Sequence, residues 1–319
     1  MRVFSAGDID RTLDFPALVD ELAEAMRGGF IAPHRHHHAV QRAGEPVATH
    51  LLMPAWTESA SRAGLYLGVK LVNVFPGNSR RGLPAVNGLY VLQSGRTGET
   101  LAAIDGTRLT HWRTASASAL AARHLARPDA KRLLIVGAGA LAPFMARAHA
   151  SVRRYERIAV WNHRPGGAER LAAALAESGL PASPAEDLEA AVAEADVISC
   201  ATLAAEPLIA GRWLRPGQHL DLVGAFNVSM READDEALRR SRIYVDTDAA
   251  LVEGGDVTVG ILGGVIDRSA VIADLPALCR GAPGRRAADE ITLFKSVGAA
   301  IEDLAAAILV LRKSGGAEP

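Results

Sequence analysis

The sequence predicts an α/β fold with two domains, a Rossmann-type doubly wound parallel sheet and an α+β domain built on an antiparallel sheet. Three observations support this prediction. The length of 319 residues is about twice that of an ordinary domain. Strand-like runs joined by short turns fill the first third of the chain, which is typical of antiparallel strands. From about residue 114, strands and helices alternate, which is typical of a parallel sheet covered by helices.

The first stretch begins with a helix and continues as strands. Leu18, Leu22 and Met26 recur at helical spacing, and the pair Gly28-Gly29 ends the helix. The strands predicted after it, separated by turn residues, cover residues 48–54, 66–75, 83–93 and 100–104.

The second stretch begins with an Ala-rich helix at residues 114–126. The elements predicted after it are strand 132–136, a helix to about 151, strand 158–161, helix 167–177, and strands 197–201, 220–223 and 243–245. Residues 291–313 are predicted as one long helix, because apolar residues from Leu293 to Leu311 step by three or four. We expect this helix to pack back on the first domain, so the predicted domains are 1–113 with 291–319, and 114–290.

Composition narrows the class of protein. A formal net charge of -1 and a pI near 6.8 argue against nucleic acid or an anionic membrane as the main partner. Two cysteines exclude a disulfide framework and favour a reducing compartment. We see no signal peptide and no run of about 20 apolar residues, so we expect a cytoplasmic protein without a membrane span.

A glycine-rich turn predicts dinucleotide binding. Gly137-Ala138-Gly139-Ala140-Leu141-Ala142 reads G-x-G-x-x-A directly after the strand RLLIV. Gly137 makes the tight turn, and Gly139 lets a pyrophosphate approach the backbone. The helix that follows offers N–H groups and a positive dipole end to the phosphates.

The end of the next strand bears on which dinucleotide binds. An NAD-binding fold usually has Asp or Glu there, to accept the ribose 2′-OH. This strand instead ends in Asn162-His163-Arg164, and Arg164 suits a 2′-phosphate. We therefore favour NADP(H) and keep NAD(H) as the alternative; the other interpretation of Arg164 is an ordinary surface residue.

Three cations stand at unusual places in the first domain. Lys70 lies in an apolar strand, Arg113 lies at the junction with the nucleotide domain, and Arg35 lies in a histidine-rich segment. If they converge, they suit a substrate carboxylate; the alternative is unrelated surface charge. The three histidines 36–38 do not predict a metal site, because consecutive residues of an extended segment point to opposite faces.

The chain resembles the ornithine cyclodeaminase/mu-crystallin family over nearly its whole length. The segments that carry the resemblance are GVKLVNVFPGN, LPAVNGLYVL, AAIDGTRLTHWRTASASALAA, VGAGALA, VWNHR, SCATLAAEPLI, LRPGQHLDLVGAF, MREADDE and EITLFKSVGAAIEDLAAA. The resemblance implies a homodimer in which the antiparallel sheets of two first domains join. It also implies a substrate cleft between the first domain and the nucleotide domain.

The resemblance assigns roles to individual residues. Lys70 and Arg113 match the family's carboxylate-binding pair, and Arg35 matches its third cationic contact. The NHR triplet resembles the N-R-T of the NADPH-using mu-crystallin branch. The residues that fall where family members touch the dinucleotide are Thr114, Gly139, Ala140, Leu141, Asn162, His163, Arg164, Thr202, Val223 and Val297.

One departure from the family separates possible activities. Cyclodeaminases of this family carry an Asp in a segment like G-G-D-C-P-G, where this chain has Gly224-Ala225-Phe226-Asn227. An acid that precedes L-M-P in those enzymes is replaced by Leu51. Neither Phe226 nor Leu51 can act as a general base or bind a side-chain ammonium.

The resemblance therefore implies NADPH-dependent reduction of a cyclic ketimine carboxylate, with Lys70 and Arg113 as the catalytic pair and Phe226 against the substrate ring. The substrates implied are Δ1-pyrroline-2-carboxylate and Δ1-piperideine-2-carboxylate, reduced to proline and pipecolate. Two alternatives remain at this stage. One is an ornithine cyclodeaminase or an alanine-type dehydrogenase, and the other is an NADPH-binding protein without turnover, as mu-crystallin is in the lens.

Overall fold

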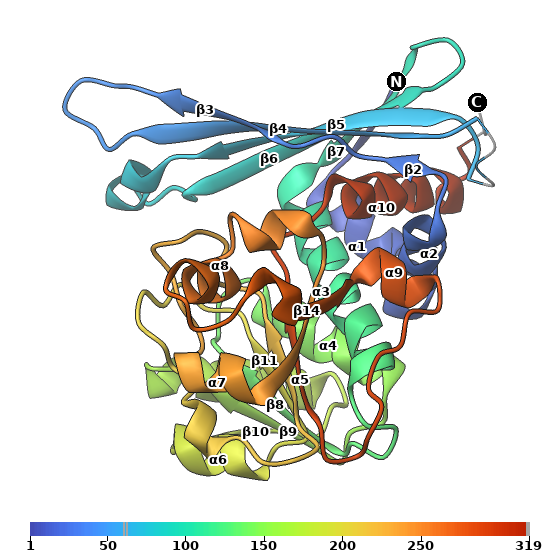
Figure 1. Cartoon of the computed structure of the whole chain (residues 1–319). Helices are drawn as coiled ribbons and strands as arrows, with labels where there is room; N and C mark the ends of the chain where they lie inside the picture. The colour runs from blue at the N-terminus through green and yellow to red at the C-terminus, as the bar shows by residue number, and fades with distance from the viewer. Residues whose placement is uncertain (60, 62, 317–319) are drawn as a thin grey trace. The chain divides into compact units, whose positions relative to one another are not determined.

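The computed structural model describes residues 1–59, 61 and 63–316, and the chain forms two compact units (Figure 1). The first unit contains the described residues of Met1–Thr114 and of the segment that begins at Ala299. The second unit is Ala115–Gly298. The first boundary falls inside a continuous helix, α3.

The first unit is built on a seven-stranded sheet in the order β1-β7-β6-β5-β4-β2, with β3 also paired to β4. β1 runs parallel to β7, and the other pairs are antiparallel, as the sequence predicts. Its elements are β1 (Arg2–Phe4), α1 (Ala6–Thr12), α2 (Phe15–Arg27), β2 (Phe30–Ile31), β3 (His36–Val40), β4 (Ala48–Thr57), β5 (Tyr66–Val74), a 3-10 helix (Pro76–Arg81), β6 (Val86–Ser94), β7 (Thr100–Asp105), α3 (Gly106–Leu125) and α10 (Ala300–Lys313).

One face of this sheet is packed against helices. α10 lies against β4, β5 and β6, and α2 packs beside α10 (Figure 1). α2 starts where the Asp14 carboxylate accepts the N–H of Ala17, and it ends before Gly28, as its helical spacing predicts. The cross-strand row Met53, Lys70 and Tyr90 is buried beneath α10. Within the described part of this unit, no helix covers the opposite face of the sheet.

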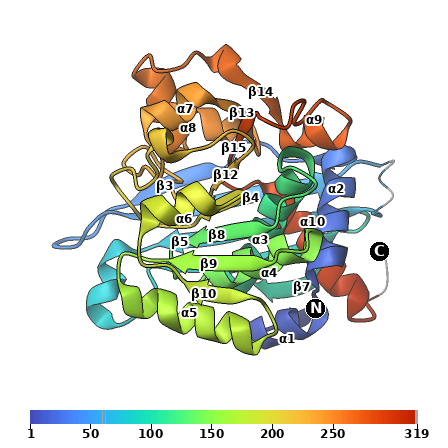
Figure 2. The same cartoon turned by 90° about the horizontal axis from the view of Figure 1, so that it is seen from below.

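The second unit is built on an eight-stranded parallel sheet in the order β10-β9-β8-β11-β12-β15-β13-β14, which confirms the predicted doubly wound sheet. Figure 2 shows β8, β9 and β10 side by side, with α5 running beside β10. Its elements are β8 (Arg132–Val136), α4 (Ala142–Val152), β9 (Arg157–Trp161), α5 (Pro165–Glu177), β10 (Ala182–Pro184), α6 (Leu188–Glu194), β11 (Val197–Cys200), β12 (His219–Leu222), α7 (Asp235–Arg240), β13 (Ser241–Val245), α8 (Gly255–Leu262), β14 (Val271–Asp274), α9 (Leu275–Cys279), β15 (Ile291–Lys295) and 3-10 helices at Gly211–Trp213, Asp248–Leu251 and Arg268–Ala270.

The chain order of the strands reverses at β8. From β8 the chain moves outward through β9 and β10, and then returns to place β11 on the other side of β8. In open parallel sheets, ligands bind outside the carboxyl ends of the strands at such a switch point. The loops that follow β8 and β11 are therefore the expected cofactor-binding edge.

The prediction of one helix over residues 291–313 is wrong for its first part. Ile291–Lys295 forms β15, which lies between β12 and β13 and is fully buried. Gly298, with φ of 81°, separates this strand from α10. A strand buried on both faces carries apolar residues on both, as Ile291, Leu293 and Phe294 do here, so the step from Leu293 to Val297 matched a helical period by chance.

Among the helices of the described residues, none is long and apolar enough to cross a bilayer.

A buried polar network joins two helices to the middle of the parallel sheet. Asp221 on β12 accepts hydrogen bonds from Ser118 Oγ at 2.9 Å and from Ser199 Oγ at 2.7 Å. His149 Nε2 on α4 lies 3.2 Å from Oδ2 of this carboxylate, the oxygen that also accepts from Ser199. All four side chains are buried, so each donor depends on Asp221 for its partner rather than on water.

Replacing Asp221 by Ala is therefore expected to destabilise the fold strongly. Loss of a charged acceptor that serves several buried donors costs about 3 kcal/mol or more. Ser199→Ala, which removes one donor, is the matched control and is expected to cost about 1 kcal/mol. Urea unfolding of both variants measures the two losses, and equal losses would contradict the central role of Asp221.

Candidate functional site

Lys70 occupies the buried face of the first unit's sheet. Its cross-strand neighbours are Met53 on β4 and Tyr90 on β6, and all three side chains point to the α10 side. Lys70 is 2% exposed. A lysine buried to this degree needs an anionic partner, because desolvation of an isolated ammonium is expensive.

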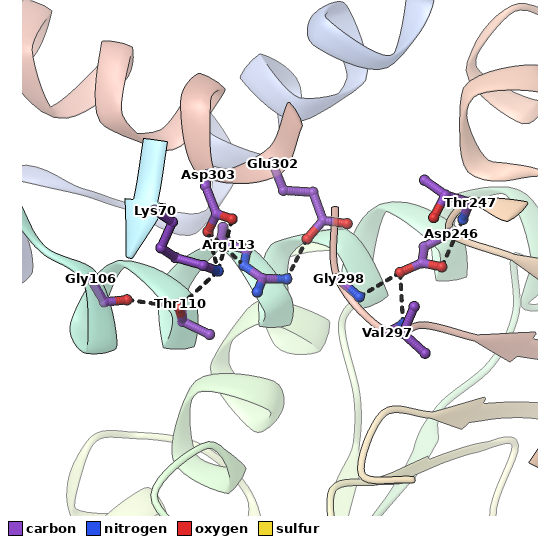
Figure 3. A network of polar contacts seen from close by, with 10 residues as sticks. All are labelled: Lys70, Gly106, Thr110, Arg113, Asp246, Thr247, Val297, Gly298, Glu302 and Asp303. Atoms are coloured by element: carbon purple, nitrogen blue, oxygen red, sulfur yellow. Dashed lines mark hydrogen bonds and ion pairs between the residues drawn. The ribbon is translucent and has the colours of Figure 1, made fainter. Parts of the chain in front are cut away.

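That partner is an acidic pair in the first turn of α10 (Figure 3). Lys70 Nζ lies 2.9 Å from Oδ1 and 2.8 Å from Oδ2 of Asp303, and it donates to Thr110 Oγ1 at 3.3 Å. Arg113 donates from Nε to Asp303 Oδ1 at 3.0 Å and from Nη1 to Glu302 Oε2 at 2.7 Å. The structure thus brings Lys70 and Arg113, the predicted carboxylate-binding pair, into one cluster. We call it the clamp cluster, and its members are Lys70, Thr110, Arg113, Glu302 and Asp303.

Burial and a like charge both act on Lys70. Desolvation, followed by repulsion from the Arg113 guanidinium, lowers the pKa of Lys70 to about 8, although Asp303 opposes the shift. The ammonium therefore begins to lose its proton within the pH range of ordinary assays.

Arg35 lies in the connection between β2 and β3. The next residue, His36, pairs with Leu52 on β4, and Leu52 pairs with Leu71 on β5, next to Lys70. The register therefore brings Arg35 to the same row of the sheet as Lys70, two strands away. Its role as a third carboxylate contact stays a prediction.

The histidine-rich segment forms β3 and alternates as an extended strand does. His36 pairs with Leu52 and His38 pairs with His50 on β4. The rings of His36 and His38 lie on one face of the sheet with their centroids 6.4 Å apart, and His37 points to the other face. Across residues 1–59, 61 and 63–316, no group of three His, Cys, Asp or Glu side chains is placed to hold a metal ion.

In the second unit, the glycine-rich turn is tight at its first glycine and open at its second. Gly137 follows β8 with φ of 107°, and a Cβ there would stand 2.9 Å from the carbonyl oxygen of Ala201. A Cβ on Gly139 would meet nothing within 4 Å, so the backbone there is open to a ligand. α4 begins after Leu141 with no side chain capping it. The N–H groups of Ala142 and Phe144 donate to the carbonyl oxygens of Gly139 and Leu141, and Pro143 has no N–H, so the helix offers a phosphate chiefly the positive end of its dipole.

The loop after β9 contains the predicted adenosine contacts. Asn162 donates from Nδ2 to the carbonyl oxygen of Arg164 at 2.9 Å, which shapes the turn into α5. His163 and Arg164 are exposed, and Arg164 is the N-cap residue of α5 without a side-chain cap bond. A positive side chain beside a helix N-terminus suits a phosphate.

Glu232 joins the loops after β11 and β12. Its carboxylate accepts from the N–H and Oγ1 of Thr202 at 2.7 and 2.8 Å, and from the N–H of Gly224 at 2.7 Å. Gly224 has no room for a side chain, since a Cβ would lie 2.0 Å from the Thr202 carbonyl oxygen. Burial raises the pKa of the Glu232 carboxyl, while Lys295 acts in the opposite direction. Thr202 is thereby held at the edge where the sequence predicts a cofactor contact.

Three other predicted residues share this edge. Val223 follows β12 and is buried, whereas Phe226, two residues beyond Gly224, is 45% exposed. Val297 follows β15, and the Asp246 carboxylate accepts the N–H groups of Val297 and Gly298 at 2.7 and 2.6 Å (Figure 3). Because β8, β9, β11, β12 and β15 are parallel, the residues that follow them lie at one edge of the sheet.

Thr114 is the remaining predicted cofactor contact. It is a buried residue of α3, next to Arg113 and at the end of the first unit. Its contact with a cofactor stays a prediction.

Sequence reasoning missed the carboxylates that organise both regions: Glu232, Asp246, Glu302 and Asp303. A signal existed for the last two, since the acids of Ile301-Glu302-Asp303-Leu304 interrupt an otherwise apolar helix. Glu232 and Asp246 bond mainly to backbone N–H groups, and such contacts leave no pattern of residue types in a sequence.

The chain is similar to known proteins over nearly its whole length. Residues 10–317 match the ornithine cyclodeaminase/mu-crystallin family. A Δ1-pyrroline-2-carboxylate reductase of Paracoccus denitrificans is 40% identical over 299 residues, which cover 93% of each chain. The solved structure of Δ1-pyrroline-2-carboxylate reductase from Thermococcus litoralis, in complex with NADH and L-proline, is 33% identical. It has a TM-score of 0.91, with 98% of this chain and 97% of that chain covered.

A second solved structure extends the comparison to another activity. An archaeal alanine dehydrogenase dimer with bound NAD is 28% identical, with a TM-score of 0.89 and coverage of 98% of this chain and 96% of that chain. The family match spans nearly the whole sequence and includes both the clamp cations and the glycine-rich turn. The chain belongs to the ornithine cyclodeaminase/mu-crystallin family.

Proposed function

We propose that this chain is an NAD(P)H-dependent reductase of a small cyclic imino acid, with Δ1-pyrroline-2-carboxylate as the expected substrate and proline as the product. The observation that carries the proposal is the burial of Lys70 and Arg113 in one cluster. Two adjacent cations on rigid elements suit a carboxylate, and Arg can bind both of its oxygens. The names of the Paracoccus and Thermococcus relatives support the same reaction.

The reaction itself requires little from the protein beyond orientation. A nicotinamide cofactor, when bound, supplies the hydride, which adds to the carbon of the C=N bond. The ring nitrogen retains the proton that it carries in the iminium form. Arg113 and Lys70 hold the neighbouring carboxylate, so the reactive carbon keeps a defined position, and such orientation accounts for much of the acceleration.

Two apolar residues favour reduction over cyclodeamination. Phe226 occupies the loop position where cyclodeaminases of the family have Asp, and it carries no titratable group. Leu51 replaces their other acid and lies on β4, on the same face as Met53, the cross-strand neighbour of Lys70. Both positions suit the carbons of a ring and provide no base for a side-chain amine.

For the cofactor, we propose NADP(H) over NAD(H). The loop after β9 has no acid that would repel a 2′-phosphate, and it offers the exposed Arg164. No ion pair of Arg164 occurs among the described residues, so its guanidinium is available. The relatives with bound nicotinamide cofactors carry NADH or NAD, which makes the preference of this chain a point to measure.

We also propose that two copies associate through the uncovered face of the first unit's sheet. Val3, Trp56 and Leu89 lie on this face and are 72%, 40% and 43% exposed. Exposed apolar side chains on one face of a sheet are typical of an interface.

The buried free cysteines Cys200 and Cys279 suit a reducing compartment, and we propose the cytoplasm.

Replacing Arg113 by Ala tests the carboxylate clamp. Loss of a charge-assisted hydrogen bond is worth about 1.5–3 kcal/mol, so kcat/KM for Δ1-pyrroline-2-carboxylate is expected to fall about 10- to 150-fold. NADPH oxidation gives the rate, and the Kd of NADPH is expected to stay within about twofold of the unsubstituted protein. Arg113→Lys serves as the control, because it keeps the positive charge but cannot form the two parallel hydrogen bonds that a guanidinium makes with a carboxylate.

Two results would contradict the proposal. Equal loss of NADPH affinity in Arg113→Ala would show that Arg113 does not act chiefly on the substrate. Release of ammonia from ornithine with NAD by the unsubstituted protein would indicate a cyclodeaminase that works without the family Asp.

The pKa of Lys70, lowered to about 8, predicts a pH dependence. Below this pH the ammonium is charged and binds the carboxylate, and above it the neutral amine binds weakly. We expect the affinity for L-proline, a zwitterion that brings no net charge, to fall about tenfold per pH unit above pH 8. In Lys70→Arg, which stays charged, the decline is expected to disappear; a decline that persists would assign the titration to another group.

Replacing Arg164 by Asp tests the cofactor preference. The new carboxylate repels a 2′-phosphate and accepts a ribose 2′-OH, so the ratio of kcat/KM for NADPH to that for NADH is expected to fall about tenfold or more. Arg170→Asp, an exposed residue of α5, is the matched control for general charge effects. An unchanged ratio in Arg164→Asp would mean that the 2′-phosphate is recognised elsewhere.

A further inference from the structure

The clamp cluster already contains carboxylates in contact with both cations. Asp303 contacts Lys70 and the Nε of Arg113, whereas Glu302 contacts the terminal Nη1 of Arg113 at 2.7 Å (Figure 3). Glu302 and Asp303 are 1% and 0% exposed. The cations that would hold a substrate carboxylate are therefore bound by the chain's own acids.

The formal charges of this cluster cancel. Lys70 and Arg113 contribute two positive charges, and Glu302 and Asp303 contribute two negative charges. A substrate carboxylate would bring a third anion into a buried space. An uncompensated buried charge is strongly unfavourable, so binding needs one carboxylate to move away, or a positive charge to arrive with the ligand.

Glu302 is better suited than Asp303 to move. Asp303 bridges two cations, so its departure would leave Lys70 and Arg113 to repel each other. Glu302 occupies a terminal guanidinium nitrogen, the part of Arg113 that forms a fork with a substrate carboxylate.

Glu302 also has an alternative position nearby. It is the third residue of α10, whose N-cap residue Ala299 provides no side-chain cap. From this third position a Glu side chain can reach back to the N-cap N–H. The positive end of the helix dipole stabilises a carboxylate there.

We propose that Glu302 is a built-in carboxylate ligand of the clamp, which a substrate carboxylate replaces on Arg113 while Asp303 keeps the two cations together. The proposal rests on the proposed function, in that the clamp is taken as the substrate's carboxylate site. It also sets a charge rule. A zwitterionic ligand, with an iminium or ammonium beside one carboxylate, keeps the cluster neutral while the displaced Glu302 stays ionised. A purely anionic ligand instead binds with uptake of one proton, which the displaced Glu302 carboxylate accepts.

The test compares two neighbouring variants with the same change of charge, Glu302→Gln and Asp303→Asn, each saturated with NADPH. The probe is pyrrole-2-carboxylate, which is anionic, and L-proline is the zwitterionic comparison. Calorimetric titration in two buffers of different ionisation enthalpy gives the Kd and the number of protons taken up. Thermal unfolding of each NADPH-bound variant checks that the fold is retained.

At pH 7, where Lys70 is charged, we expect the unsubstituted protein to take up about one proton per pyrrole-2-carboxylate bound and none with L-proline, because only the anion changes the charge of the cluster. Glu302→Gln removes the competing carboxylate, so the uptake is expected to disappear and the Kd of pyrrole-2-carboxylate to become about tenfold tighter. Asp303→Asn separates the cations and is expected to weaken the same Kd about tenfold or more. A merely structural role of Glu302 predicts weaker binding in both variants.

Two outcomes would overturn the inference: Glu302→Gln binds the anion as weakly as Asp303→Asn does, or the unsubstituted protein binds it without proton uptake. These outcomes are separate from failure of the proposed function. Ketimine reduction by the unsubstituted protein, with weaker anion binding in Glu302→Gln, would leave the function standing and reject the exchange. Tighter anion binding in Glu302→Gln, without any ketimine reduction by the unsubstituted protein, would support the exchange and reject the proposed function.

Discussion

Burial of Lys70 and Arg113 side by side is the constraint on which the first unit depends. Two like charges removed from water repel each other and lose their hydration, and only well-placed carboxylates make the arrangement tolerable. Asp303 meets this need because α10 packs across β4, β5 and β6, directly over the strand that carries Lys70. The register of the sheet, the position of α10 and the clamp are therefore linked. A shift of one residue along β5 would turn Lys70 to the opposite face of the sheet.

The second unit uses buried carboxylates in a different way. Glu232 and Asp246 accept backbone N–H groups from loops that follow the strands, and Asp256 holds the backbone of Glu232 at 2.8 Å. Such loops carry N–H groups that no neighbouring strand satisfies. By satisfying them, the acids hold the loops at the expected cofactor-binding edge in one position. A preformed edge of this kind binds a ligand without first having to become ordered.

The departures at Phe226 and Leu51 are consistent with a reaction that needs orientation more than acid–base chemistry. A protonated imine is already an acceptor for hydride, so loss of a carboxylate costs its reduction little. Cyclisation of a diamino acid is different, because its attacking amine must lose a proton. Within one family, a clamp and a nicotinamide site can thus serve several reactions, and the residues around them select among these.

Much of this arrangement was predictable from the sequence alone. The helix over Phe15–Arg27, the two kinds of sheet and the glycine turn follow from local patterns of apolar residues and turn residues, which neighbouring parts of the chain do not override. Lys70 and Arg113 were recognisable because a cation in an apolar segment needs an explanation. Only the tertiary structure decided that Ile291–Lys295 is a strand, since an apolar segment buried on both faces loses the alternation that distinguishes strand from helix. It also decided the partners Asp303 and Glu302, which lie 233 and 189 residues from the cations they bind, because pairing over such separations depends on packing and leaves no local trace in the sequence.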